Sequence, residues 1–244
     1  DVCDKDERLW AAAEMFVATG EEKYKSALEE LCKENLGKTD FGWTDVSGLA
    51  SMAILTDIKK QTPVELRREF RDIILTEADR LTNISEESGY LVAMKPEDYV
   101  WGSNMVVLNR GMLMVLACTL LKEDVADDRH KTQKTIYENT ALAQLHYLLG
   151  TNAVGYSYVT GYGENAYKNP HNRPTECDGI ELPMPGWVSG GPSGIPYDET
   201  AIQNISQGTP PMKCYLDYVM CYSLNEITIY WNSPAVFVTA YFNR

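Results

Sequence analysis

The chain has 244 residues, 44% of them hydrophobic and 23% charged, which is the composition of a soluble globular protein with a sizeable core. The formal net charge of -13 argues against a nucleic-acid partner, because phosphates would repel an acidic surface. No apolar run approaches the about 18 residues that a membrane span needs, so no membrane partner is expected.

Residues before Gly150 carry the periodicity of amphipathic helices. Leu9, Ala13 and Phe16, for example, would share one face of the first helix. Pro63 suits the first turn of a helix, and Gly150 suits a helix C-cap. The predicted helices cover residues 7–19, 21–34, 46–59, 64–81, 103–121 and 131–149. Consecutive helices with no strand-like alternation predict an all-α array of helical hairpins.

The segment 150–211 has a different composition, with 10 of the 17 glycines and 8 of the 11 prolines. Helical periodicity ends there because these residues favour turns. Aromatic residues such as Tyr156, Tyr158 and Trp187 argue against disorder. The segment is therefore predicted to form ordered loops around a surface site. Helical patterns return at 212–224 and 233–241.

Two carboxylates among aromatic residues follow these loops. The pattern reads Tyr215-x-Asp217-x4-Tyr222-x3-Glu226-x-Thr228-x3-Asn232-Ser233. Cleavage of a glycosidic bond needs an acid that protonates the leaving oxygen, and aromatic faces stack on sugar rings. A partly apolar environment, which favours a protonated carboxyl group, is expected around Glu226 from Tyr222, Ile227, Ile229 and Trp231. From the residues alone, a solvent-exposed glutamate at a helix end remains the commoner interpretation.

Asp217 lies nine residues before Glu226. On a continuous helix that separation spans about 13 Å, more than the about 6.5–9.5 Å between the acid and the base of an inverting glycosidase. Asp217 is therefore predicted to support the active site rather than to activate water.

An earlier motif reads Ser157-x-Val159-Thr160-x2-Gly163-x-Asn165-x4-Pro170-His171-x-Arg173. Together and in this order, the two motifs resemble both sequence signatures of the glycoside hydrolase family 9 cellulases. The resemblance covers the whole chain but only part of a family catalytic domain, so residues 1–244 are expected to be its C-terminal portion. It implies an all-α fold that is part of an (α/α)6 barrel with long active-site loops. The family's Asp-Ala-Gly-Asp motif, which supplies the catalytic base, is absent from the 244 residues.

The activity implied by the resemblance is that of an endo-β-1,4-glucanase, which hydrolyses cellulose or related β-glucans with inversion. Glu226 would be the general acid, and Asp217 would belong to the active site. His171 and Arg173 would contact the sugar on either side of the cleaved bond. Trp101 and Trp231 are candidate stacking platforms for glucose rings, with a buried core position as the alternative for each. A secreted, extracellular enzyme is expected.

No cofactor is required for this chemistry, but members of the resembled family often bind calcium. Asp4, Asp6 and Asp45 are the carboxylates that could hold a structural calcium ion. A simpler role for Asp6 is to favour the N-terminus of the first helix.

The expected partners are the β-glucan substrate and either the missing N-terminal half of the domain or a second copy of the chain. Two other functions stay open. One is a non-catalytic carbohydrate-binding fragment, which activity on soluble cellulose derivatives would exclude. The other is a different hydrolase or lyase on the same kind of barrel, which the range of products would reveal.

Overall fold

The computed structural model describes residues 3–122 and 128–243. The chain divides into two compact units, the first within Asp1–Arg80 and Leu116–Thr135 and the second within Leu81–Val115 and Ile136–Arg244. The candidate catalytic and substrate-binding residues all lie in the second unit. The three aspartates considered as calcium ligands lie in the first.

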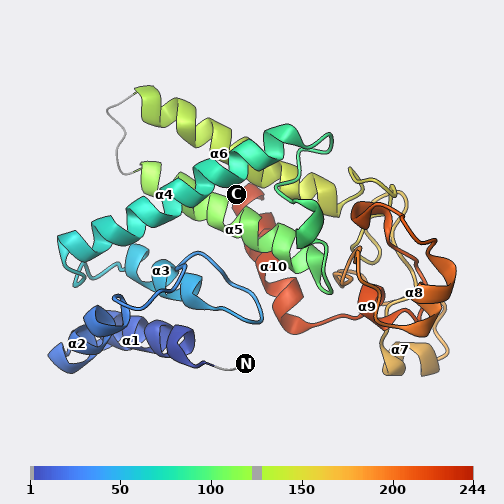
Figure 1. Ribbon diagram of the computed structural model, residues 1–244, viewed down its shortest axis with the longest axis horizontal. Helices are drawn as coiled ribbons and strands as arrows, with labels where there is room; N and C mark the ends of the chain where they lie inside the picture. Colours follow the sequence, from blue (N-terminus) through green and yellow to red (C-terminus); the bar gives the residue numbers. More distant parts are fainter. Residues whose placement is uncertain (1–2, 123–127, 244) are drawn as a thin grey trace. The chain divides into compact units, whose positions relative to one another are not determined.

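The first unit begins with α1 (Lys5–Thr19), α2 (Glu22–Leu31) and α3 (Ser47–Leu55), and α1 packs against the other two helices (Figure 1). Leu9, Ala13 and Phe16 are buried on α1, as the sequence predicts. The helix ends at Gly20, whose left-handed conformation (φ 70°) lets its N–H reach the Phe16 carbonyl. All three helices form in the predicted regions, and their ends differ from the predicted ends by a few residues.

Three longer helices follow: α4 (Val64–Glu87), α5 (Ser103–Lys122) and α6 (Asp128–Leu148). Each contributes residues to both units. The sequence suggested that no apolar run is long enough to span a membrane. The helix α5 corrects this expectation, because it is long and apolar enough by composition to cross one. However, 83% of its most apolar window is buried inside the protein, as in the core helix of a globular domain.

The segment from Gly150 to Pro211 is largely irregular, as predicted, and contains only the short helices α7 (Arg173–Cys177) and α8 (Glu199–Asn204) (Figure 1). Within residues 3–122 and 128–243 no β-strand forms. Isolated bridges pair Ser157 with Ala166, Val159 with Val188, and His171 with Glu226. The described chain is therefore all-α with long loops, which confirms the predicted class.

The predicted helix over 212–224 is wrong. A 3-10 turn, η2 (Pro211–Lys213), is followed by irregular backbone, and α9 (Tyr222–Asn225) is a single turn. The last helix, α10 (Ile229–Phe242), begins before the predicted residue 233. It starts there because the Thr228 side chain caps it, accepting the Trp231 N–H at 3.2 Å. A second 3-10 turn, η1 (Pro96–Asp98), precedes α5.

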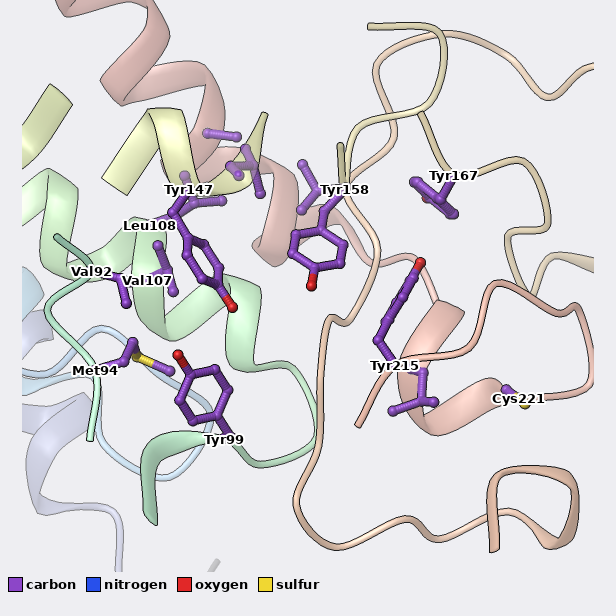
Figure 2. Packing of buried hydrophobic residues seen from close by; sticks show 14 of the residues in the cluster. Val92, Met94, Tyr99, Val107, Leu108, Tyr147, Tyr158, Tyr167, Tyr215 and Cys221 are labelled. Carbon is purple, nitrogen blue, oxygen red and sulfur yellow. The ribbon is translucent and has the colours of Figure 1, made fainter. Parts of the chain in front are cut away.

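Buried tyrosines join the loops of the second unit to its helices (Figure 2). Tyr147 comes from α6, whereas Tyr158 and Tyr215 come from irregular segments. The ring centroids lie 6.0 Å apart for Tyr147 and Tyr158, and 4.9 Å apart for Tyr158 and Tyr215. Each such ring buries about 150–250 Å² of surface. This packing explains how a segment rich in glycine and proline can hold side chains in fixed positions.

Candidate active site

Glu226 sits where the single turn of α9 ends. Its backbone is extended (φ −57°, ψ 148°) and pairs with His171 in an isolated parallel bridge. The His171 N–H donates to the Asn225 carbonyl at 2.8 Å, and the Gly190 N–H donates to the Glu226 carbonyl at 3.0 Å. Two loops from different parts of the sequence therefore hold the main chain on both sides of Glu226.

The Glu226 side chain is half-buried beside aromatic rings. Its Oε2 accepts a hydrogen bond from Trp101 Nε1 at 3.1 Å. The centroid of the Trp101 ring lies 5.4 Å from those of both Tyr197 and Tyr222. The expected aromatic environment is present, but much of it comes from residues distant in sequence. Ile229, which was expected to contribute, is 91% exposed.

His171 is half-buried, with its ring centroid 5.9 Å from that of Tyr222. Its Nδ1 lies 2.7 Å from the Val219 carbonyl oxygen. Because a carbonyl oxygen can only accept, Nδ1 carries the hydrogen and Nε2 is left for other partners. In a neutral His171, Nε2 can accept a hydrogen bond from a hydroxyl group, such as those of a sugar.

Arg173 begins α7, two residues after His171. The N-cap of this helix is Asn172, whose Oδ1 accepts the Thr175 N–H at 3.2 Å. The Arg173 side chain is exposed, and within the described residues its guanidinium has no hydrogen-bond partner. It can therefore donate to a ligand without first breaking an internal contact.

Asp217 organises the loop that leads to His171. Its Oδ2 accepts the Lys168 N–H at 2.8 Å, and its Oδ1 accepts the Asn169 N–H at 2.9 Å. The Asn169 side-chain amide also donates to the Asp217 carbonyl at 3.3 Å. These bonds suit the predicted supporting role. The distance between Asp217 and Glu226 was estimated for a continuous helix. That helix does not form, so the estimate was wrong.

Trp231 is not a stacking platform, and this expectation is wrong. Only 3% of the residue is exposed, whereas Trp101 is 38% exposed. A Cβ atom added to Gly102 or Gly190 would lie 3.1 Å from the Trp231 ring, so both glycines pack closely on it. Trp231 therefore supports the loops of Gly102 and Gly190 and cannot present a face to a sugar.

Burial raises the pKa of two side chains close to Glu226 in sequence. Burial raises the pKa of Tyr215 well above its usual value, and it raises the pKa of the Cys221 thiol to about 12, with a smaller contribution from nearby Asp198. Both groups therefore stay protonated at neutral pH. The Tyr215 hydroxyl keeps its hydrogen and donates it to Asn225 Oδ1 at 2.7 Å.

The three aspartates considered for calcium are not assembled into a metal site. Within the described ranges no group of three His, Cys, Asp or Glu side chains could hold a metal ion. Asp6 Oδ2 accepts the Val46 N–H at 2.8 Å, and Asp45 Oδ1 accepts the Ser47 N–H at 2.7 Å. Burial alone would raise the pKa of Asp6, but the Val46 bond and other hydrogen bonds lower it. In the part of the chain that the structure describes, Asp4, Asp6 and Asp45 therefore do not come together as a set of calcium ligands.

Three residues near Glu226 were not among the predicted site residues. Tyr197 packs on Trp101, and its carbonyl accepts the Tyr222 hydroxyl at 3.1 Å. Asp198 is buried and accepts from the Ala201 N–H and the Ser223 hydroxyl, which ties α8 to α9. Asn225 is fully buried. Only the position of Asn225 next to Glu226 could have drawn attention to it from the sequence.

Comparison with known proteins gives the same family throughout. The family model described as Glycosyl hydrolase family 9 matches residues 1–239. A cellodextrinase from Butyrivibrio fibrisolvens is 43% identical over 248 residues, which cover 96% of this chain and 43% of that protein. A cellulose 1,4-beta-cellobiosidase from Acetivibrio thermocellus is 34% identical, with 98% of this chain and 28% of that protein covered.

Solved structures match equally well. A single mutant of a thermostable endoglucanase from Alicyclobacillus acidocaldarius aligns with a TM-score of 0.85 at 33% identity, over 99% of this chain and 43% of that one. AaCel9A in complex with cellobiose-like isofagomine aligns with a TM-score of 0.85 at 35% identity, over 99% and 44%. The chain thus spans less than half the length of these relatives. Structures of this family are (α/α)6 barrels, and this all-α chain forms part of one. On the family match along nearly its whole length and the 43% identity to a relative, the chain belongs to glycosyl hydrolase family 9.

Proposed function

We propose that the protein containing this chain hydrolyses β-1,4-glucosidic bonds of cellulose or related β-glucans, with Glu226 as the general acid. The observation that carries this proposal is the half-buried Glu226 carboxylate beside aromatic rings, hydrogen-bonded to Trp101 and next to His171. The names of relatives support the substrate class, since they include a cellulose 1,4-beta-cellobiosidase and endoglucanases. Since cellulose lies outside cells, an extracellular location is part of the proposal.

The proposed reaction is a single displacement with inversion. Glu226 gives its proton to the glycosidic oxygen as the bond from that oxygen to the anomeric carbon breaks. Water attacks the anomeric carbon from the opposite face and loses a proton to a base. No cofactor takes part in these steps.

The base is proposed to come from the Asp-Ala-Gly-Asp motif of a preceding part of the same protein. Aspartates of this chain suit the role less well. Asp198 is buried with both carboxylate oxygens accepting hydrogen bonds, and both oxygens of Asp217 accept backbone N–H groups. Asp178 is exposed, but its Oδ1 accepts the Ile180 N–H in its own turn.

Three side chains are proposed to bind the sugar. The exposed part of the Trp101 ring offers a stacking face, His171 Nε2 can accept from a sugar hydroxyl, and Arg173 can donate to one. A charge-assisted hydrogen bond of the Arg173 type contributes about 1.5–3 kcal/mol.

Residues 1–244 are proposed to be the C-terminal portion of the catalytic domain, with the N-terminal half as partner. The apolar face of α10 supports this, because Ile229 is 91% and Val236 66% exposed. Two hollows of about 730 and 470 Å³ lie along this helix, and Asn232 and Val236 line both. Helices of the missing half, or of a second copy, would cover this surface.

The test of Glu226 is the Glu226→Gln variant in the full-length protein. Gln keeps the size of the side chain but has no acidic proton. Turnover of unactivated cellulose should fall by about 10²–10⁴-fold, while binding of cello-oligosaccharides is retained. Glu181→Gln, a change at an exposed glutamate in the same run of loops, is the matched control and should have no effect.

Near-normal turnover of cellulose by Glu226→Gln would refute the assignment. Oligosaccharide binding without any turnover by the unmodified full-length protein would instead point to a non-catalytic carbohydrate-binding role. Products other than cello-oligosaccharides would indicate a different hydrolase or lyase.

A further inference from the structure

The side chain of Asn225, fully buried next to Glu226, uses its hydrogen-bonding groups within the protein. Its Nδ2 shares its two hydrogens among three backbone carbonyls, those of Leu216 at 2.7 Å, Tyr218 at 3.1 Å and Cys221 at 3.3 Å. Its Oδ1 accepts from the Tyr215 hydroxyl at 2.7 Å. The orientation of the amide is therefore fixed, because three carbonyls require a donor and the protonated hydroxyl supplies one.

The carbonyls bound by Asn225 lie in the loop that also carries two other parts of the site. Leu216 precedes Asp217, whose carboxylate holds the loop leading to His171. Tyr218 precedes Val219, whose carbonyl accepts from His171 Nδ1 at 2.7 Å. One buried amide thus connects the main chain beside Glu226 to both supports of His171.

The backbone of Asn225 adds a second connection. Its carbonyl accepts the His171 N–H at 2.8 Å, next to the bridge between His171 and Glu226. Tyr215, which holds the other end of the amide, is itself fixed in the tyrosine core by its edge contact with Tyr158 (Figure 2). The network of hydrogen bonds therefore runs from the core of the second unit to His171 and Glu226.

We propose that Asn225 is a positioning residue that fixes the Glu226 carboxyl group relative to His171 for proton transfer. The inference rests on the proposed role of Glu226 as general acid. Proton transfer requires the donor within hydrogen-bond reach of the glycosidic oxygen, and a misplacement of about 1 Å can cost about 100-fold in rate. Asn225 does not contact the reacting atoms and acts only through Glu226 and His171.

The experiment is the Asn225→Asp variant of the full-length protein. Asp keeps the shape and one acceptor oxygen but replaces the amide donor by a second oxygen, so three carbonyls lose the side-chain donor and keep only their backbone N–H partners. Turnover is compared on a cello-oligosaccharide, whose leaving group needs a proton, and on a dinitrophenyl β-cellobioside, whose leaving group does not. The expected result is a drop in kcat that is about 10–100-fold larger for the oligosaccharide than for the dinitrophenyl substrate.

Asn152→Asp is the matched control. Asn152 is also a buried asparagine in a loop of the second unit, with Nδ2 donating to the Tyr147 and Tyr156 carbonyls at 2.8 and 2.7 Å. Its Oδ1 accepts the Gly155 N–H at 2.9 Å. The same chemical change there should lower stability and leave the ratio of the two activities as in the unmodified protein.

The outcomes separate this inference from the function on which it rests. If Glu226→Gln shows no selective loss on the oligosaccharide, the proposed general acid is wrong and this inference falls with it. If Glu226→Gln shows the selective loss but Asn225→Asp lowers both activities equally, the general acid stands and the positioning role is overturned.

Should Asn225→Asp fail to fold, Tyr215→Phe removes one bond to the amide. A selective loss in Tyr215→Phe supports the proposal, and an equal loss on both substrates overturns it.

Discussion

At the residue scale, exposure separates the two tryptophans proposed as sugar-binding platforms. Trp101 combines an exposed ring with a donor to Glu226, whereas Trp231 is enclosed by Gly102 and Gly190. Although the two side chains are chemically identical, their different exposure predicts different consequences for their substitution. Burial therefore assigns Trp231 to the fold, whereas the partly exposed Trp101 keeps its proposed role in binding substrate.

Trp231→Ala in the full-length protein should lower the free energy of unfolding by about 3–5 kcal/mol, as for other large core residues. Trp101→Ala should lower it by only about 0.5–1.5 kcal/mol, the value of an aromatic pair, but should raise the KM for cello-oligosaccharides. Urea unfolding and steady-state kinetics measure the two effects. Trp43→Ala, at a largely exposed tryptophan of the first unit, should change neither quantity. A larger stability loss in Trp101→Ala than in Trp231→Ala would contradict this division.

At the scale of elements, the loop around Gly190 and Gly191 joins the start of α5 to the Glu226 turn. The Asn104 N–H donates to the Gly190 carbonyl at 3.0 Å, and the Gly191 N–H donates to the Leu224 carbonyl at 2.9 Å. Gly191 has a φ of 90°, and a Cβ atom there would lie 2.5 Å from Asn104 Cγ. Any side chain at this position is therefore strained and also displaces the buried Asn104.

Gly191→Ala should destabilise the protein by more than the about 1–2 kcal/mol of left-handed backbone strain alone, and it should lower turnover of cellulose. Gly179→Ala is the control, since Gly179 has a φ of 75° but nothing within 4 Å of an added Cβ atom. The difference in melting temperature between the two variants measures the contact with Asn104. Equal melting temperatures, with cellulose turnover as in the unmodified protein, would show that the loop adjusts freely.

At the scale of the whole molecule, α10 presents apolar side chains that a soluble monomer rarely leaves uncovered, including Ile229, Val236 and Phe237. The chain also spans only 43% of the cellodextrinase it resembles. The exposed face and the shorter length fit a barrel that is completed by other helices.

Residues 1–244 expressed alone should therefore self-associate and hydrolyse cellulose orders of magnitude more slowly than the full-length protein, because the proposed base is lacking. Light scattering gives the oligomeric state, and release of reducing sugar gives the activity. The full-length protein, measured in the same buffer, is the reference. A well-folded monomer of residues 1–244 with full activity would contradict both the expected self-association and the expected loss of activity. The candidates for the base would then be Asp178, Asp198 and Asp217.

Local sequence was sufficient for most helices and for the family. The six helices before Gly150 form where periodicity predicts them, although α4 continues to Glu87, because the spacing of apolar residues along one helix is a local property. The spaced motifs around His171 and Glu226 likewise identify the family, since they record residue types at fixed separations.

The tertiary structure was needed wherever a residue's role depends on distant partners. Residues 212–224 carry a helical pattern but form no continuous helix. The Asn225 side-chain amide donates to the carbonyls of Leu216, Tyr218 and Cys221, and the Asp217 carboxylate accepts a hydrogen bond from the loop of Lys168. The bond between Trp101 and Glu226 joins residues 125 positions apart. Exposure, which separates Trp101 from Trp231, is a sum over all neighbours in space. Because most of those neighbours are distant in sequence, no local pattern predicts exposure. The exposure of these tryptophans and the hydrogen bonds of Asn225 were therefore visible only in the folded chain.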